Sequence, residues 1–218
     1  KSAADMYMAR QLMRAAGSAA LLIAKIERTE AVANLDEILD ASDGIMVARG
    51  DLAVEVGDAA VPALQKKMIR AARDRNKLTI TATQMMESMI TSPVPTRAEV
   101  SDVANAVLDG TDAVMLSAET ASGQFPVEVI EAMSRVCLEA EKSAEVSLDR
   151  EVLNRVFTRI DQSIAMAAIW TAYHLKVKAI ASLTQTGSTA LWMSRLNAGV
   201  PIYALTPEVS ARNQMTLY

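Results

Sequence analysis

A short apolar run that ends in polar residues and is followed by an amphipathic stretch recurs four times in this chain. The apolar runs cover residues 21–26, 44–48, 78–82 and 113–116. The positions at their ends, Lys25, Arg49, Thr83 and Ser117, are separated by 24, 34 and 34 residues. A (β/α)8 barrel uses about 31 residues for each strand and its helix. We therefore predict four neighbouring parallel strands, which are half of such a barrel.

Amphipathic helices are predicted between these strands. Thr96 and Glu99 form a capping box, in which each side chain bonds the backbone N–H of the other residue, so a helix should begin there and end near Gly110. Further helices are predicted over residues 6–16, 61–75 and 127–142.

The pattern changes after about residue 143. Residues 143–156 are polar and weakly periodic, which predicts a connection between a barrel domain over residues 1–145 and a second domain over residues 146–218. The expected elements of the second domain are a helix over 162–175, a strand over 179–183, a loop over 184–189, a helix over 190–197 and a strand over 202–205. This order predicts part of an open α/β sheet.

Composition excludes several classes of partner. The net charge is −4, so no basic excess is available for nucleic acid or an anionic membrane surface. No apolar run approaches the roughly 18 residues of a membrane span, and a single cysteine cannot form an internal disulfide. We therefore expect a cytoplasmic protein with neither a nucleic-acid nor a membrane partner. Because the first residue is Lys1 rather than Met, we also expect the chain to be part of a longer polypeptide.

The predicted strand ends carry charged side chains in a repeated arrangement. Residues two apart on a strand point the same way, so three pairs are predicted to face the barrel mouth, where barrel enzymes have their active sites. These pairs are Lys25 with Glu27, Arg49 with Asp51, and Ser117 with Glu119.

Two of these carboxylates suit a divalent cation. Glu27 and Asp51 end neighbouring strands, so they can converge on Mg²⁺, which takes a few carboxylates and completes its shell with water and substrate oxygens. Lys25 would then be a fixed positive charge beside a transferring phosphoryl group. The backbone N–H groups of Gly50 and Asp51 could hold a substrate carboxylate. A plain ion pair between Glu27 and Arg49 fits the same spacing.

Five longer motifs resemble the pyruvate kinase family. They are KIER at residues 25–28, MVARGDL at 46–52, TATQMMESM at 81–89, TRAEV at 96–100 and DAVMLSAET at 112–120. The resemblance covers almost the whole chain. It implies the second half of a catalytic TIM (β/α)8 barrel followed by part of an open α/β C-terminal regulatory domain. It also implies glycolytic phosphoryl transfer from phosphoenolpyruvate to ADP, by the complete polypeptide only.

The resemblance also assigns roles to individual residues. It implies that Lys25 stabilises the transferring phosphoryl group, and that Glu27 and Asp51 bind Mg²⁺ or Mn²⁺. Gly50, Asp51 and Thr83 would contact phosphoenolpyruvate, with Thr83 near the face where enolpyruvate is protonated. K⁺ as a second cofactor and a homotetrameric assembly are further implications of the family.

The loop over residues 184–189 is the candidate effector site. The family binds a phosphorylated allosteric effector here, which implies contacts from Thr184, Thr186, Ser188 and Thr189. The family often has a basic residue where this chain has Ser188, so we expect contacts from backbone N–H groups and hydroxyls instead. The alternative is that the hydroxyls only cap the next helix. A second departure is Ala53, where the family usually has Gly; we expect only a small backbone adjustment there.

Two other function classes are compatible with the strand-end chemistry. A Mg²⁺-dependent barrel lyase acting on an enolate could also use two carboxylates beside a cation. A non-enzymatic scaffold or effector-binding protein is the third class.

Overall fold

A computed structural model describes residues 1–143, 156–157, 159–196 and 199–218. The chain divides into two compact units, Lys1–Ala144 and Glu145–Tyr218. The sequence predicts the connection at about residues 143–156, most of which lie outside the described residues.

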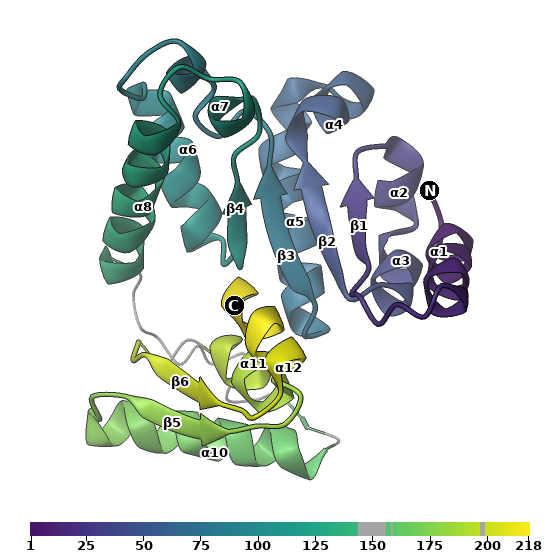
Figure 1. Cartoon of the computed structure of the whole chain (residues 1–218), viewed down its shortest axis with the longest axis vertical. Helices are drawn as coiled ribbons and strands as arrows, with labels where there is room; N and C mark the ends of the chain where they lie inside the picture. The colour runs from purple at the N-terminus through teal and green to yellow at the C-terminus, as the bar shows by residue number, and fades with distance from the viewer. Residues whose placement is uncertain (144–155, 158, 197–198) are drawn as a thin grey trace. The chain divides into compact units, whose positions relative to one another are not determined.

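The first unit is built on one parallel sheet with the strand order β1-β2-β3-β4 (Figure 1). The strands are β1 (Ile23–Ile26), β2 (Gly44–Ala48), β3 (Leu78–Ala82) and β4 (Ala113–Met115). All four predicted strands are therefore present, although β1 begins two residues later than predicted. In the register, Lys25 pairs with Met46, and Met46 pairs with Ile80. Because the strands are parallel and in sequence order, their carboxyl ends lie along one edge of the sheet.

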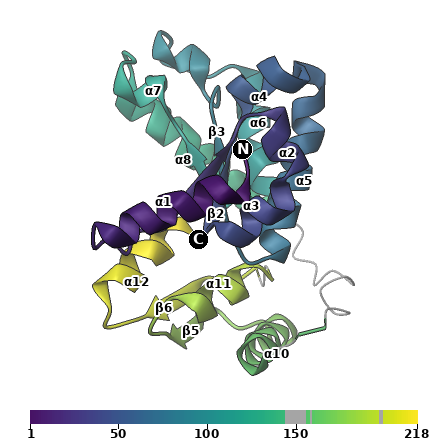
Figure 2. The same cartoon turned by 90° about the vertical axis from the view of Figure 1, so that its right-hand side faces the viewer.

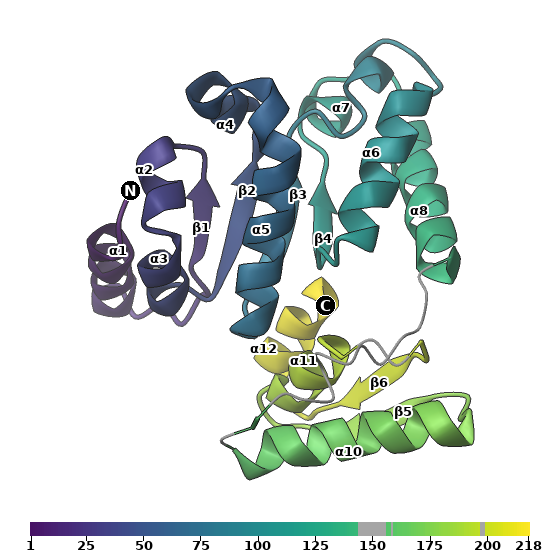
Figure 3. The same ribbon diagram turned by 180° about the vertical axis from the view of Figure 1, so that it is seen from behind.

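Helices cover one face of this sheet, and α5 lies against β2 and β3 (Figure 3). The α-helices are α1 (Ala3–Ala15), α2 (Thr29–Ala33), α3 (Leu35–Ala41), α4 (Arg49–Val56), α5 (Val61–Asp74), α6 (Arg97–Leu108), α7 (Ala118–Ala121) and α8 (Pro126–Ser143). Two short 3₁₀ helices are η1 (Asp58–Ala60) and η2 (Glu87–Ile90). The predicted helices correspond to α1, α5, α6 and α8. The short helices that follow the strands directly, α2, α4 and α7, were not predicted, because four to eight residues are too few for a clear apolar period.

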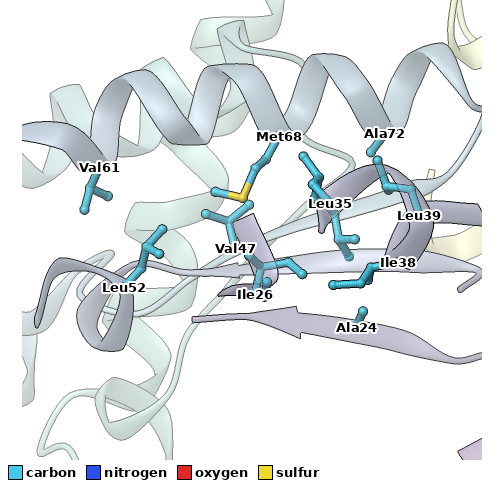
Figure 4. Close-up of a cluster of buried hydrophobic side chains, with 12 residues drawn as sticks. Ala24, Ile26, Leu35, Ile38, Leu39, Val47, Leu52, Val61, Met68 and Ala72 are labelled. Atoms are coloured by element: carbon cyan, nitrogen blue, oxygen red, sulfur yellow. The ribbon is translucent and has the colours of Figure 1, made fainter. Parts of the chain in front are cut away.

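The main core of the first unit lies between the sheet and its helices (Figure 4). Ile26 and Val47 point from the strands toward Met68 on α5, and Leu39 joins them from α3; all four side chains are at most 1% exposed. Since Ile26 faces this core, its neighbour Lys25 faces the other side of the sheet. The strand alternation therefore places the lysine on the face of the sheet opposite α5.

A second core, rich in methionine, supports the segment that follows β3. Met85, Met86 and Met89 are fully buried and pack with Val103 of α6 and Val129 of α8. Flexible methionine side chains fill irregular spaces well. This irregular segment is therefore anchored to the two helices beneath it.

The second unit contains a parallel two-stranded sheet, β5 (Ile180–Leu183) and β6 (Ile202–Leu205). Its helices are α10 (Ile160–Leu175), α11 (Ser188–Ser194), α12 (Val209–Gln214) and the 3₁₀ helix η3 (Met215–Leu217). Ile169 of α10 and Met193 of α11 form its core with the strands (Figure 2, where α10 is seen nearly along its axis). The α/β order agrees with the prediction. Across the ranges described in both units, no helix combines the length and apolar character that crossing a membrane requires.

Candidate active site

Lys25, Glu27 and Asp51 come together at the carboxyl edge of the first sheet. Lys25 is the third residue of β1, Glu27 follows the end of that strand, and Asp51 lies in the first turn of α4. Lys25 Nζ lies 2.5 Å from Glu27 Oε2 and 3.3 Å from Asp51 Oδ2. The geometry therefore brings together the three side chains that the strand pattern selected, with the ammonium group in contact with both carboxylates.

The charges in this cluster support one another. The hydrogen bond to Glu27, followed by that to Asp51, raises the pKa of Lys25 above its ordinary value of 10.5. The two carboxylates therefore favour the charged form that a lysine already has at neutral pH. Its side chain is 50% exposed, so the cluster is accessible to a solute.

The two carboxylates also fit a magnesium ion. Both already contact one cation, Lys25 Nζ, so they are close enough to act on a common positive charge. Within the described ranges of the chain, no group of three or more His, Cys, Asp and Glu side chains could hold a metal ion. An ion held by two carboxylates must complete its coordination shell with water and substrate oxygens, as Mg²⁺ commonly does in proteins.

Arg49 does not face the mouth beside Asp51, so the predicted pairing of these two residues is wrong. β2 ends at Ala48 and α4 begins at Arg49, and residues two apart on a helix are about 200° apart around its axis. Arg49 consequently points inward and is 8% exposed, whereas the Asp51 side chain is 63% exposed. The alternative ion pair between Glu27 and Arg49 is also absent within residues 1–143, since Arg49 pairs with Asp102 at 2.6 Å.

Thr83 holds the start of α4 by its hydroxyl group. Its Oγ1 accepts a hydrogen bond from the Gly50 N–H at 2.8 Å and donates one to the Ala82 carbonyl at 2.6 Å. The Gly50 N–H that was predicted to meet a substrate carboxylate is thus already bonded to Thr83. The same contact places the Thr83 hydroxyl beside the helix that carries Asp51.

The backbone at Thr83 is unusual. Thr83 has φ +72° and Gln84 has φ +55°, both in the left-handed region. A β-branched residue in that region is a genuine outlier, and such residues persist only where their surroundings hold them. Strained residues of this kind cluster at functional sites.

Glu119 is buried, and the prediction that it faces the mouth beside Ser117 is also wrong. It lies in the first turn of α7 and is 3% exposed. Its carboxylate accepts hydrogen bonds from the Ser117 N–H at 2.7 Å and the Met86 N–H at 3.2 Å. A helix that begins at Ala118 again replaces the strand alternation on which the prediction depended. Glu119 therefore stabilises the segment after β3 through its hydrogen bond with the Met86 N–H.

Sequence reasoning missed Asp102 and half of the role of Glu99. Thr96 and Glu99 form the predicted capping box, but the Glu99 carboxylate also accepts hydrogen bonds from the N–H and hydroxyl of Ser88, at 2.7 and 2.5 Å. Burial alone would raise the pKa of Glu99, yet the hydrogen bonds from Ser88 and Thr96 outweigh it and lower that pKa. No local pattern indicates the Arg49–Asp102 pair, because its members are far apart in the sequence.

In the second unit, the predicted effector loop connects β5 to α11. Thr184 Oγ1 accepts a hydrogen bond from the Gly187 N–H at 3.0 Å, and the hydroxyls of Thr186 and Ser188 are 3.0 Å apart. Gly187 has φ +86°, and an added Cβ would lie only 2.7 Å from the Tyr218 hydroxyl, so glycine is required there. The helix begins at Ser188, two residues earlier than predicted, and therefore Ser188 and Thr189 form its first turn.

Comparison with known proteins gives consistent matches in both units. The family model "Pyruvate kinase, barrel domain" matches residues 1–130, and "Pyruvate kinase, alpha/beta domain" matches residues 162–218. A pyruvate kinase of Haemophilus influenzae is 54% identical over 100% of this chain and 46% of its own length. Pyruvate kinase II of Salmonella typhimurium is 54% identical over 98% of this chain and 45% of its own. A pyruvate kinase of Buchnera aphidicola is 53% identical over 98% and 45%. The chain thus spans about half the length of the curated relatives it matches.

Proposed function

This chain belongs to the pyruvate kinase family, and on that premise we propose that the complete polypeptide transfers the phosphoryl group of phosphoenolpyruvate to ADP, giving pyruvate and ATP. One observation carries the proposal. The Lys25 ammonium contacts both Glu27 and Asp51 at the carboxyl edge of a parallel sheet, which is where barrel enzymes carry out their chemistry.

Lys25 is the proposed catalytic cation. Phosphoryl transfer spreads negative charge over the oxygens of the moving group, and a fixed cation stabilises that charge without reorganising during the reaction. Lys25 is a cation throughout the neutral range at its ordinary pKa of 10.5, and the contacts with Glu27 and Asp51 raise that pKa further. Its position between two carboxylates also restricts the side chain before substrate arrives.

Glu27 and Asp51 are the proposed ligands of Mg²⁺ or Mn²⁺. When bound, the ion neutralises charge on the phosphoryl and carboxylate oxygens of the substrate. The two carboxylates hold the positive charge at the sheet edge, and Lys25 adds a second positive charge on the same side. The requirement for K⁺ that the family implies remains part of this proposal.

Gly50, Asp51 and Thr83 are the proposed contacts of phosphoenolpyruvate. Because its N–H is bonded to Thr83 Oγ1, Gly50 would give the substrate space for close approach rather than a donor, and the same hydrogen bond fixes the start of α4 against the end of β3. We assign Thr83 to the carbon face at which enolpyruvate accepts a proton after phosphoryl transfer. Its hydroxyl donates its proton to the Ala82 carbonyl, and its second lone pair can accept a hydrogen bond from an ordered water molecule.

The second unit is the proposed site of regulation. Thr184, Thr186, Ser188 and Thr189 provide hydroxyl groups around the turn between β5 and α11, and we propose that they bind the phosphate of an allosteric effector. Assembly as a homotetramer and a cytoplasmic location complete the proposal.

The test is an assay of the complete polypeptide with phosphoenolpyruvate, ADP, Mg²⁺ and K⁺, in which pyruvate is measured by its enzymatic reduction. The expected result is pyruvate formation that requires ADP. The matched control is the Lys25→Met variant, which removes the proposed catalytic cation and keeps a side chain of similar length. Carbon–carbon bond cleavage without a nucleotide would instead identify a lyase and contradict the proposal.

A further inference from the structure

We propose that Arg49 is a positioning residue that holds Thr83 in its catalytic conformation, with Asp102 as the anchor of its guanidinium group. The inference rests on the proposed function, because it concerns how Thr83 takes part in that reaction. It adds two residues, Arg49 and Asp102, that do not themselves touch substrate.

The guanidinium group of Arg49 reaches in two directions at once. Nη1 donates to Asp102 Oδ1 at 2.7 Å on α6, and Nη2 donates to the Thr83 carbonyl at 2.8 Å. Nη2 also lies 2.9 Å from Met85 Sδ. The planar fork of an arginine suits this arrangement, because its donors point in fixed and different directions.

Arg49 and the next residue hold Thr83 at two points. The Arg49 side chain binds the Thr83 carbonyl, and the Gly50 N–H binds the Thr83 hydroxyl at 2.8 Å. Two contacts on one residue fix the orientation of its side chain as well as its position. Since Arg49 and Gly50 both belong to the first turn of α4, this pair also ties Thr83 to the helix that carries Asp51.

Thr83 needs such support because its backbone is strained. With φ +72° at Thr83 and +55° at Gln84, two successive residues have left-handed backbone conformations, which residues other than glycine rarely adopt. A charged donor aimed at the Thr83 carbonyl stabilises this conformation relative to a relaxed one. Without that donor, we expect the peptide to relax and the hydroxyl to move away from the substrate face.

Asp102 makes the position of Arg49 specific. The Arg49 side chain is only 10% exposed, and a buried guanidinium group needs a partner to offset the loss of water. Asp102 supplies that partner from α6 and directs Nη1 away from the segment that follows β3. The other amino group, Nη2, then faces the segment after β3, where it donates to the Thr83 carbonyl at 2.8 Å and also reaches the Gln84 carbonyl at 3.4 Å.

The alternative is that Arg49 stabilises the fold and has no particular effect on Thr83. A double-mutant cycle in the complete enzyme separates the two roles. Arg49→Lys keeps the positive charge but removes the fork, and we expect kcat to fall about tenfold or more, because displacing a reacting group by about 1 Å can cost 10²-fold. Thr83→Ala removes the hydroxyl that Arg49 is proposed to position.

The variant that combines Arg49→Lys with Thr83→Ala distinguishes the two roles by its kcat. If Arg49 acts through Thr83, Arg49→Lys should lower kcat by less than about threefold once Thr83 is already alanine, because residues acting in series are not additive. A purely structural role predicts the same factor in both backgrounds. Arg75→Lys is the matched control: Arg75 also bonds an aspartate, Asp36 at 2.8 Å, and lies at the end of α5, and this variant should leave kcat unchanged.

Asp102→Asn keeps the test decisive if Arg49→Lys fails to fold, since it leaves Arg49 in place and removes only the charge of its anchor. Asp102→Asn should likewise lower kcat in the parent enzyme and have much less effect on kcat once Thr83 is alanine. Equal factors in both backgrounds would overturn the inference while leaving the proposed function intact. A parent enzyme without ADP-dependent pyruvate formation would overturn both.

Discussion

Glu99→Gln tests how the segment after Thr83 is held in place. The Glu99 carboxylate accepts hydrogen bonds from the backbone N–H groups of Ser88 and Thr96, both at 2.7 Å, and from their hydroxyls at 2.5 and 2.8 Å. These contacts join η2 to the first turn of α6. Glutamine has the same size and keeps one carbonyl acceptor, but it lacks the charge and the second acceptor.

The magnitude follows from those four hydrogen bonds. A hydrogen bond to a charged group contributes about 1.5–3 kcal/mol, and neutral ones contribute about 1 kcal/mol. Glutamine would keep only neutral hydrogen bonds, and only at its single carbonyl oxygen. Because the site is half-buried, we expect the local free energy of opening to fall by about 2 kcal/mol. That loss corresponds to amide exchange about 30-fold faster in η2 and the residues before Thr96.

The pH dependence has a definite sign. Hydrogen bonds from Ser88 and Thr96, acting against burial, lower the pKa of Glu99 below its ordinary value of 4.5. The stabilisation by the charged form is therefore fully present above the unfolded pKa and is lost as the pH falls through the lower folded value. The difference in amide exchange rate between the parent and Glu99→Gln should consequently become smaller below pH 4.5.

Hydrogen–deuterium exchange measured by mass spectrometry on the complete polypeptide provides the assay, with rates corrected for intrinsic exchange at each pH. Glu131→Gln, an exposed glutamate on α8, is the matched control and should leave exchange in this segment unchanged. Unaltered exchange in Glu99→Gln at neutral pH would refute the proposed anchoring. A difference that stays constant through acidic pH would refute the assignment of the effect to the charged carboxylate.

Three further predictions concern the proposed sites. Lys25→Met should lower kcat by about 10² or more with a smaller effect on the KM for phosphoenolpyruvate, because a fixed cation acts mainly in the transition state; a change confined to KM in steady-state assays would contradict this. Glu27→Gln should raise the Mg²⁺ concentration for half-maximal activity about tenfold or more and lower kcat, so an unaltered Mg²⁺ titration would remove Glu27 from metal binding. Ser188→Ala combined with Thr189→Val should bring the ratio of activity with and without each phosphorylated effector close to one, whereas a fully retained ratio would make the loop purely structural.

Much of the fold was predictable because its signals are local. Apolar runs gave the four strands of the first sheet, and their parallel order followed from the spacing of the repeats. The capping box of Thr96 and Glu99 located the start of α6 at the correct residue. Hydrogen bonds between residues three apart, and side chains that alternate along a strand, depend only on neighbouring residues.

The candidate site was predictable in part: strand alternation placed Lys25 and Glu27, and Asp51 also reaches Lys25 although it lies on α4. Lys25 lies on β1 and Glu27 directly follows it, and their side chains meet as predicted, at 2.5 Å. Arg49 and Glu119 were misplaced because a helix begins immediately after each strand and turns the side chains to other directions. A side chain just after a strand keeps the alternation of that strand only where no helix begins.

Sequence alone therefore determined which residues form the four strands of the first sheet, and that Lys25, Glu27 and Asp51 gather at its carboxyl edge. Only the tertiary structure decided what holds Thr83 in place. Arg49 reaches Asp102 and the Thr83 carbonyl across 53 and 34 positions of sequence. The physical reason is that a buried guanidinium group pairs with whichever acceptors the packed helices and strands place around it, and no periodic pattern within a single element records that choice.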